Sequence, residues 1–114
     1  MIKLYGIPNC DTVKKSQKWL DTHRIKYEFH DYKKHGVTKK QLSEWCRKIE
    51  WNKLLNKRSR TWKELTEKER DNLTKTKAIT LMQQHPTLIK RPVAQQEKTI
   101  TVGFDEKLFK ENFK

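Results

Sequence analysis

The residue best suited to chemistry in this sequence is Cys10. It lies in the polar stretch 8–13, which follows the apolar run 2–7 and precedes a helical pattern, so we expect it at the N-terminus of a helix. Unpaired N–H groups and the positive end of the helix dipole favour a thiolate there, and Lys14 adds positive charge, whereas Asp11 acts against it. The pattern predicts a nucleophilic thiol; the alternative is a small residue that fills a turn.

The second cysteine and the histidines indicate no further reactive site. Cys46 shares a helical face with Leu42, Trp45 and Ile49, and we interpret it as a buried structural cysteine. The four histidines have no ligand spacing with one another or with a cysteine, so no metal site is expected. The sequence has neither a Cys-x-x-Cys pair nor a disulfide framework, which predicts reduced thiols in a cytoplasmic protein.

Two arginines could bind an anion at such a thiol. Arg91 immediately precedes Pro92, and an X-Pro bond is the one at which the cis peptide is least unfavourable. Arg58 lies in a basic stretch between two helical segments, near Arg60. A guanidinium that faces a thiolate site would bind an oxyanion or a carboxylate through two parallel hydrogen bonds. The alternative for each arginine is a plain surface charge, which we prefer for Arg60.

The period of the apolar residues predicts the elements that position Cys10. Residues 2–7 form a first strand. Val13, Ser16, Trp19 or Leu20, and His23 recur every three or four positions, which predicts an amphipathic helix of about three turns. Residues 25–31 alternate as a second strand. A strand, a helix and a strand in this order predict two parallel strands joined by a right-handed crossover.

The middle of the chain is predicted to be helical. Four threonines are expected to begin helices, three of them with capping-box spacing: Thr38, Thr61, Thr66 and Thr74. In the last of these helices Ala78, Leu81 and Met82 face inward, and Pro86 ends it.

The end of the chain returns to strands. Residues 87–89 and 98–102 are expected to be short strands, and Asp105 to begin a final helix. The fold class is therefore α/β, in the order β-α-β, helical insertion, β-β-α. The predicted division is an α/β core of residues 1–35 and 86–114 with an inserted helical subdomain of residues 36–85.

The composition is polar and basic, with 36% charged residues and a net charge of +13. This charge concentrates anions such as phosphates and carboxylates near the protein, although a solvated lysine surface explains most of it. No apolar stretch approaches the ~18 residues that indicate a membrane span, and no nucleic-acid recognition motif is present. We expect a monomer with neither a membrane nor a specific nucleic acid as partner.

Several motifs together resemble the arsenate reductase (ArsC)/Spx family, with its YffB-like branch as the nearest match. They are YGIPNCDTVKK near the N-terminus, FHDYKKHG, LLNKR followed by TWKEL, PTLIKRP, and VGFD near the C-terminus. Their order and spacing are kept over essentially the whole chain. The resemblance implies a thioredoxin-like fold with a mixed sheet and a helical insertion between its βαβ and ββα halves.

The resemblance also implies site residues at the matching positions. Cys10 corresponds to the nucleophile, Arg58 and Arg91 to two active-site arginines, and Pro92 to the cis-proline beside the cysteine loop. The residues expected to bind glutathione or another substrate are Asn9, Asp11, Thr12, Lys14, Arg58, Arg91 and Pro92.

The sequence departs from the family pattern at three points. The approach to Cys10 has no histidine, no arginine follows Pro92, and Val13 stands where Spx-type switches carry a second cysteine. Lysines cannot reproduce the fork of a third arginine, so arsenate reduction is the less favoured activity. An intramolecular Cys-x-x-Cys switch is excluded.

We therefore expect an ArsC-like monothiol oxidoreductase, a glutathione-dependent thiol reductase with Cys10 as the nucleophile. Glutathione carries two carboxylates that suit arginines, and an outside thiol, glutathione or glutaredoxin, would resolve the mixed disulfide. The alternative from another class is an Spx-like regulatory module that contacts an RNA polymerase subunit. Non-specific nucleic-acid binding is a third hypothesis, supported only by the basic charge.

Overall fold

The computed structural model describes residues 1–114, which divide into two compact units. Unit 1 comprises residues 1–35 and 91–114, and unit 2 comprises residues 36–90. No helix has both the length and the apolar character needed to cross a membrane.

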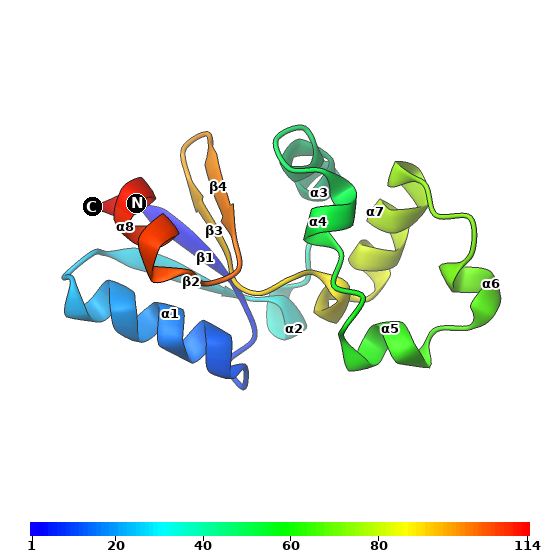
Figure 1. The fold of residues 1–114 in the computed structure, drawn as a ribbon, viewed down its shortest axis with the longest axis horizontal. Coiled ribbons are helices and arrows are strands. Elements are labelled where there is room, and N and C mark those ends of the chain that lie inside the picture. The colour runs from blue at the N-terminus through cyan, green and yellow to red at the C-terminus, as the bar shows by residue number, and fades with distance from the viewer. The chain divides into compact units, whose positions relative to one another are not determined.

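Unit 1 is a four-stranded sheet with three helices (Figure 1). Its elements are β1 (Ile2–Gly6), α1 (Asp11–Thr22), β2 (Tyr27–Asp31), α2 (Tyr32–His35), β3 (Val93–Gln96), β4 (Thr99–Val102) and α8 (Glu106–Phe113). The strand order is β2-β1-β3-β4, with β1 and β2 parallel and the other neighbours antiparallel. The predicted α/β class and the parallel βαβ unit are confirmed.

One face of this sheet is buried beneath α1 and α8. Leu4 of β1 and Ala94 of β3 are fully buried in a cluster with Leu20 of α1 and Phe109 of α8. Trp19 meets Phe109 edge to face, with 5.5 Å between the ring centroids. Full burial of a large apolar side chain stabilises a fold by roughly 1.5–3 kcal/mol, so this cluster fixes α1, and with it the start of α1, against the sheet.

Unit 2 is helical. Its elements are α3 (Lys39–Cys46), α4 (Trp51–Leu54), α5 (Arg60–Glu64), α6 (Glu67–Arg70), α7 (Lys75–Gln84) and the 3₁₀ turn η1 (Pro86–Leu88). Three predicted threonine caps are confirmed, since the hydroxyls of Thr38, Thr66 and Thr74 each accept a hydrogen bond from the N–H three residues later. Glu69 completes a capping box with Thr66.

The predicted helix start at Thr61 is wrong by two residues. The cap of α5 is Ser59, whose Oγ accepts from the Trp62 N–H at 3.1 Å. Thr61 therefore lies inside the first turn, where its hydroxyl bonds to that of Thr87. The spacing of Thr61 and Glu64 is compatible with a capping box, but the serine two positions earlier provides the cap.

The predicted strand at residues 87–89 is also wrong. Pro86 opens a 3₁₀ turn, and only Ile89 pairs with a neighbour, in an isolated bridge to Leu55. The Lys90 N–H donates to the Leu54 carbonyl at 2.9 Å, so residues 86–90 group with unit 2 rather than with the α/β core. The strand that the pattern missed is β3, which lies between β1 and β4 and buries adjacent residues instead of alternate ones.

Candidate active site

Cys10 is the N-cap residue of α1, as predicted, and its free thiol is half-buried. Its backbone is extended, and its side chain makes no capping hydrogen bond. Its carbonyl accepts the first intrahelical bond, from the Lys14 N–H at 2.9 Å. The N–H groups of residues 11–13 consequently have no acceptor within the helix, and they leave hydrogen-bond donors at the end that carries the sulfur.

A close contact behind this loop holds α1 against the end of β1. Gly6 is the last residue of β1, and a Cβ atom built on it would lie 2.7 Å from Cγ2 of Val13. Val13 is fully buried in the first turn of α1. Any larger residue at position 6 would push this turn away from the strand. The sequence gives no sign that position 6 needs a glycine, because the contact is with a residue of another element.

The other predicted residues of the cysteine loop surround the start of α1. Asn9 precedes the cap, Asp11 and Thr12 form the first turn, and Lys14 follows one turn on; all four are exposed. Their side chains are available to a ligand that approaches Cys10 from solvent.

Arg91 and Pro92 come to the same end of the sheet. They directly precede β3, whose Val93 pairs with Tyr5 near the end of β1. The Arg91–Pro92 bond is cis, as the resemblance implies. Pro92 is buried and Arg91 is half-buried. The sheet register therefore brings residue 91 to the end of the sheet from which the Cys10 loop leaves.

Tyr32, which we did not single out, is also placed at this edge. Tyr32 directly follows β2, whose last residue Asp31 pairs with Gly6. The Tyr32 side chain is only 1% exposed. Its hydroxyl has no hydrogen-bond partner. Burial raises the pKa of Tyr32 well above its usual value, the neighbouring Tyr5 raises it further, and the Arg91 charge opposes both. Arg91 thus lies within electrostatic reach of a buried, unpaired phenol.

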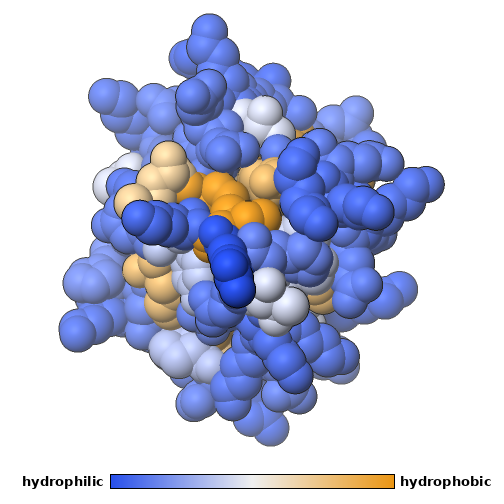
Figure 2. All heavy atoms as spheres, turned by 90° about the vertical axis from the view of Figure 1, so that its left-hand side faces the viewer, coloured by the Kyte–Doolittle hydropathy of each residue, from blue (hydrophilic) through white to orange (hydrophobic).

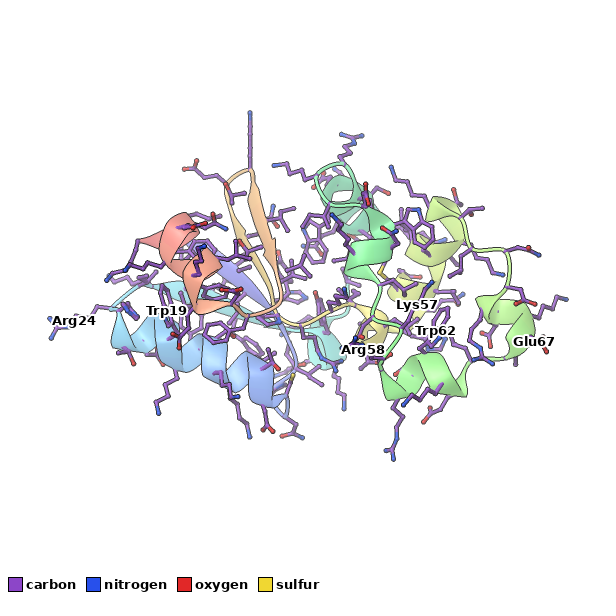
Figure 3. The ribbon with its side chains drawn as sticks, viewed as in Figure 1. Trp19, Arg24, Lys57, Arg58, Trp62 and Glu67 are labelled. Atoms are coloured by element: carbon purple, nitrogen blue, oxygen red, sulfur yellow. The ribbon has the colours of Figure 1, made fainter.

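Arg58 lies in unit 2, on a turn that ends at the cap of α5. The side chain of Asn56 accepts from the Arg58 N–H at 3.0 Å, and Ser59 Oγ donates to the Asn56 carbonyl at 2.9 Å. Arg58 itself is exposed, and the neighbouring Lys57 ammonium lies 5.7 Å from the centre of the Trp62 ring (Figure 3). All predicted site residues except Arg58 belong to unit 1.

Cys46 differs from the prediction in its burial. Leu42 and Trp45 are fully buried, but Cys46, the last residue of α3, is only half-buried. Burial raises the pKa of the Cys46 thiol, and the Lys75 ammonium partly opposes this shift. The prediction of a buried cysteine was wrong in degree: Cys46 ends α3 and keeps part of its surface exposed.

Three comparisons place this geometry among known proteins. A model of the ArsC family matches residues 5–112. An uncharacterised protein of Haemophilus influenzae is 43% identical over 99% of both chains, and the global transcriptional regulator Spx 1 of Lactococcus lactis is 29% identical over 93% of this chain and 84% of its own. The solved structure of the YFFB (PA3664) protein superposes with a TM-score of 0.95 at 40% identity and covers 97% of both chains. These likenesses confirm the thioredoxin-like fold class expected from the sequence.

Proposed function

Because the chain belongs to the ArsC family, in its YffB-like branch and related to the Spx regulators, we propose that it is a monothiol oxidoreductase that uses glutathione. Cys10 is the nucleophile, and the protein acts in the reducing cytoplasm. One observation carries the proposal: the thiol occupies the cap position of a twelve-residue helix whose first N–H groups no side chain caps. These donors can bond to an anionic sulfur or to an anionic substrate at the sulfur.

Arg91 gives the substrate a second point of attachment. Arg91 directly precedes β3, whose Val93 pairs with Tyr5 near the end of β1, and its guanidinium can hold a carboxylate of glutathione through two parallel hydrogen bonds. Tyr32 adds a buried hydroxyl within electrostatic reach of this charge. The proposal also assigns Arg58 to the glutathione, on the family resemblance alone.

The reaction consists of two thiol–disulfide exchanges. The Cys10 thiolate attacks the glutathione sulfur of a mixed disulfide, forms a bond to it, and releases the substrate thiolate, which takes a proton from water. A second glutathione thiolate then attacks the Cys10–glutathione disulfide, forms oxidised glutathione and returns the Cys10 thiolate. In total, one mixed disulfide is reduced to a thiol while two glutathione sulfurs are joined, so the electrons balance.

An outside thiol is required because the start of α1 carries no second cysteine. Val13 occupies the position three residues after Cys10 and is fully buried against Gly6. Glutathione or a glutaredoxin is therefore the proposed reductant. Arsenate is the less favoured substrate, since no arginine follows Pro92.

A regulatory role is the second candidate. It is favoured by the likeness to the Spx 1 regulator, which extends over 93% of this chain. In this case the protein would bind an RNA polymerase subunit, and the binding would survive the loss of the Cys10 thiol.

Reduction of the mixed disulfide between glutathione and 2-mercaptoethanol tests the proposal. Cys10→Ser should lower the turnover rate on the order of 10³-fold, because the hydroxyl is a far weaker nucleophile, while circular dichroism stays unchanged. Cys46→Ser is the matched control and should change the rate less than about twofold. A wild-type protein with no glutathione-dependent turnover, or equal losses in the two variants, would overturn the reductase proposal. Polymerase binding by Cys10→Ser would then favour the regulatory role.

A further inference from the structure

A second candidate binding site lies in unit 1, in the groove between α1 and α8. The groove has a volume of about 710 Å³, within the range of small-molecule sites. Figure 3 shows Trp19 on the side of α1 that faces α8, and Figure 2 shows that this end of unit 1 is hydrophilic apart from a small apolar area. Nothing in the proposed thiol chemistry uses this groove.

Five of the ten residues that line the groove are lysines, against one glutamate. Lys15 and Lys18 project from α1, Lys107 and Lys110 project from α8, and Lys114 is the residue that follows α8. The spacing of three residues puts Lys107 and Lys110 on one face of α8, and Lys114 directly follows the last residue of the helix. None of the five side chains forms an ion pair or a hydrogen bond. Several unpaired like charges in one groove produce a strongly positive potential, which an anion with more than one charge relieves.

The groove also contains partly exposed rings. His23 and Phe104 are half-buried and line it together with the edge of Trp19. The His23 ring centroid is 4.1 Å from that of Trp19, and His23 Nδ1 donates to the Trp19 carbonyl at 2.8 Å. The carbonyl can only accept, so the proton of this bond is on Nδ1. The bond and the ring contact together hold the imidazole against the indole. The ring surface can stack on a flat heterocycle, as aromatic platforms do in nucleotide sites.

We propose that this groove binds a nucleoside polyphosphate, with the phosphates on the lysines of α8 and α1 and the base on the His23 and Phe104 rings. The size of the groove suits one nucleotide, and the lysines provide more positive charge than a single phosphate requires. The same phosphate chemistry could come from a free nucleotide or from a single strand of nucleic acid, and the groove volume favours the free nucleotide.

Calorimetric titration of the full chain with ATP tests this site. Lys107→Gln/Lys110→Gln should weaken ATP binding about tenfold or more, because two charge-assisted contacts are lost. The control, Lys33→Gln/Lys34→Gln, removes the same charge from exposed lysines of α2 outside the groove and should weaken binding less than about twofold. In amide NMR spectra, ATP should shift resonances of α1 and α8. Absence of ATP binding, or equal losses in the two variants, would overturn the proposal.

Two further titrations identify the source of the phosphate. Tripolyphosphate should bind more weakly than ATP; equal affinity would show that the rings contribute nothing and would overturn the assignment of a nucleotide. An eight-residue oligothymidylate should bind no more tightly than ATP at about 150 mM salt, where the non-specific phosphate contacts are weakened. Tighter binding of the oligonucleotide by more than about tenfold would overturn the free nucleotide in favour of a strand.

Discussion

The start of α1 differs from the starts of the other long helices. Thr38 begins α3, Thr74 begins α7 and Asp105 begins α8, and each of these side chains accepts a hydrogen bond from an N–H of the first turn. Cys10 begins α1 and makes no such bond. A hydroxyl or carboxylate cap consumes a helix donor to stabilise the fold, whereas the cysteine leaves the donors of α1 available to a ligand. This difference is the structural basis of the proposed role of Cys10, since the other three helix starts already use their donors within the fold.

The largest change in stability should come from substitution of Gly6, because this glycine allows the uncapped first turn of α1 to lie against β1. Gly6→Ala places a Cβ atom against Val13 and should lower the free energy of unfolding by about 1–3 kcal/mol, the usual range for overpacking. Urea unfolding provides the measurement.

The Gly6 effect should depend on Val13. In a Val13→Ala background the side chain that clashes is gone, so the additional cost of Gly6→Ala should fall below about 1 kcal/mol. Additive costs in this double-mutant cycle would show that the contact between strand and helix does not limit position 6.

Tyr32→Phe should stabilise the protein by about 1 kcal/mol, since it removes a buried hydroxyl that has no partner. The raised pKa of Tyr32 also makes the wild-type stability depend on pH. Above about pH 10 the tyrosine ionises in the unfolded chain before it does in the folded protein, so the free energy of unfolding falls as the pH rises. The Tyr32→Phe variant lacks this group and should lose less stability between pH 7 and pH 10.5.

The matched control for Tyr32 is Tyr27→Phe on the same strand–helix segment. The Tyr27 hydroxyl is hydrogen-bonded to Gln17 and Asp21, so its removal should leave stability unchanged or lower it. Thermal unfolding at pH 7 and pH 10.5 compares the two variants. A destabilised Tyr32→Phe protein would show that the hydroxyl has a stabilising partner.

The caps themselves give a smaller contrast. Thr74→Ala removes a hydroxyl that accepts from the Lys77 N–H and should cost about 1 kcal/mol in urea unfolding. Cys10→Ala removes no capping bond and should cost less than about 0.5 kcal/mol. Equal costs would contradict the distinction between the two kinds of helix start.

The smallest effect concerns the reactivity of Cys46. Burial raises the pKa of this thiol and Lys75 lowers it, so Lys75→Gln should raise it further. A higher pKa leaves less thiolate at pH 8, and alkylation of Cys46 should slow by about twofold. Faster alkylation in the variant would reverse the assigned sign of the Lys75 effect.

Local patterns predicted much of this molecule. The period of apolar residues located α1, β2 and α8, capping-box spacing located the caps at Thr38 and Thr66, and Thr74 was expected as the residue before a helical pattern. These features depend on residues a few positions apart, which the sequence displays directly.

The misses share a physical cause, which is packing between distant segments. β3 is a central strand without alternation, and the turn at Pro86 is set by pairing with Leu55. The tight fit of Gly6 and the burial of Tyr32 likewise depend on neighbours that are remote in sequence. At the site, Cys10 was recognisable from its position before a helix, whereas the proximity of Arg91 and Tyr32 required the sheet register.

The relative alkylation rates of the two cysteines test the central claim most directly. The protein is treated with limiting iodoacetamide at pH 7, and peptide mass spectrometry follows the modification of Cys10 and Cys46 over time. The Cys10 thiol lies at a helix start with free N–H donors and exposed neighbours, while the raised pKa of Cys46 disfavours its thiolate. We predict that Cys10 reacts at least about tenfold faster than Cys46; equal rates, or faster modification of Cys46, would contradict the account.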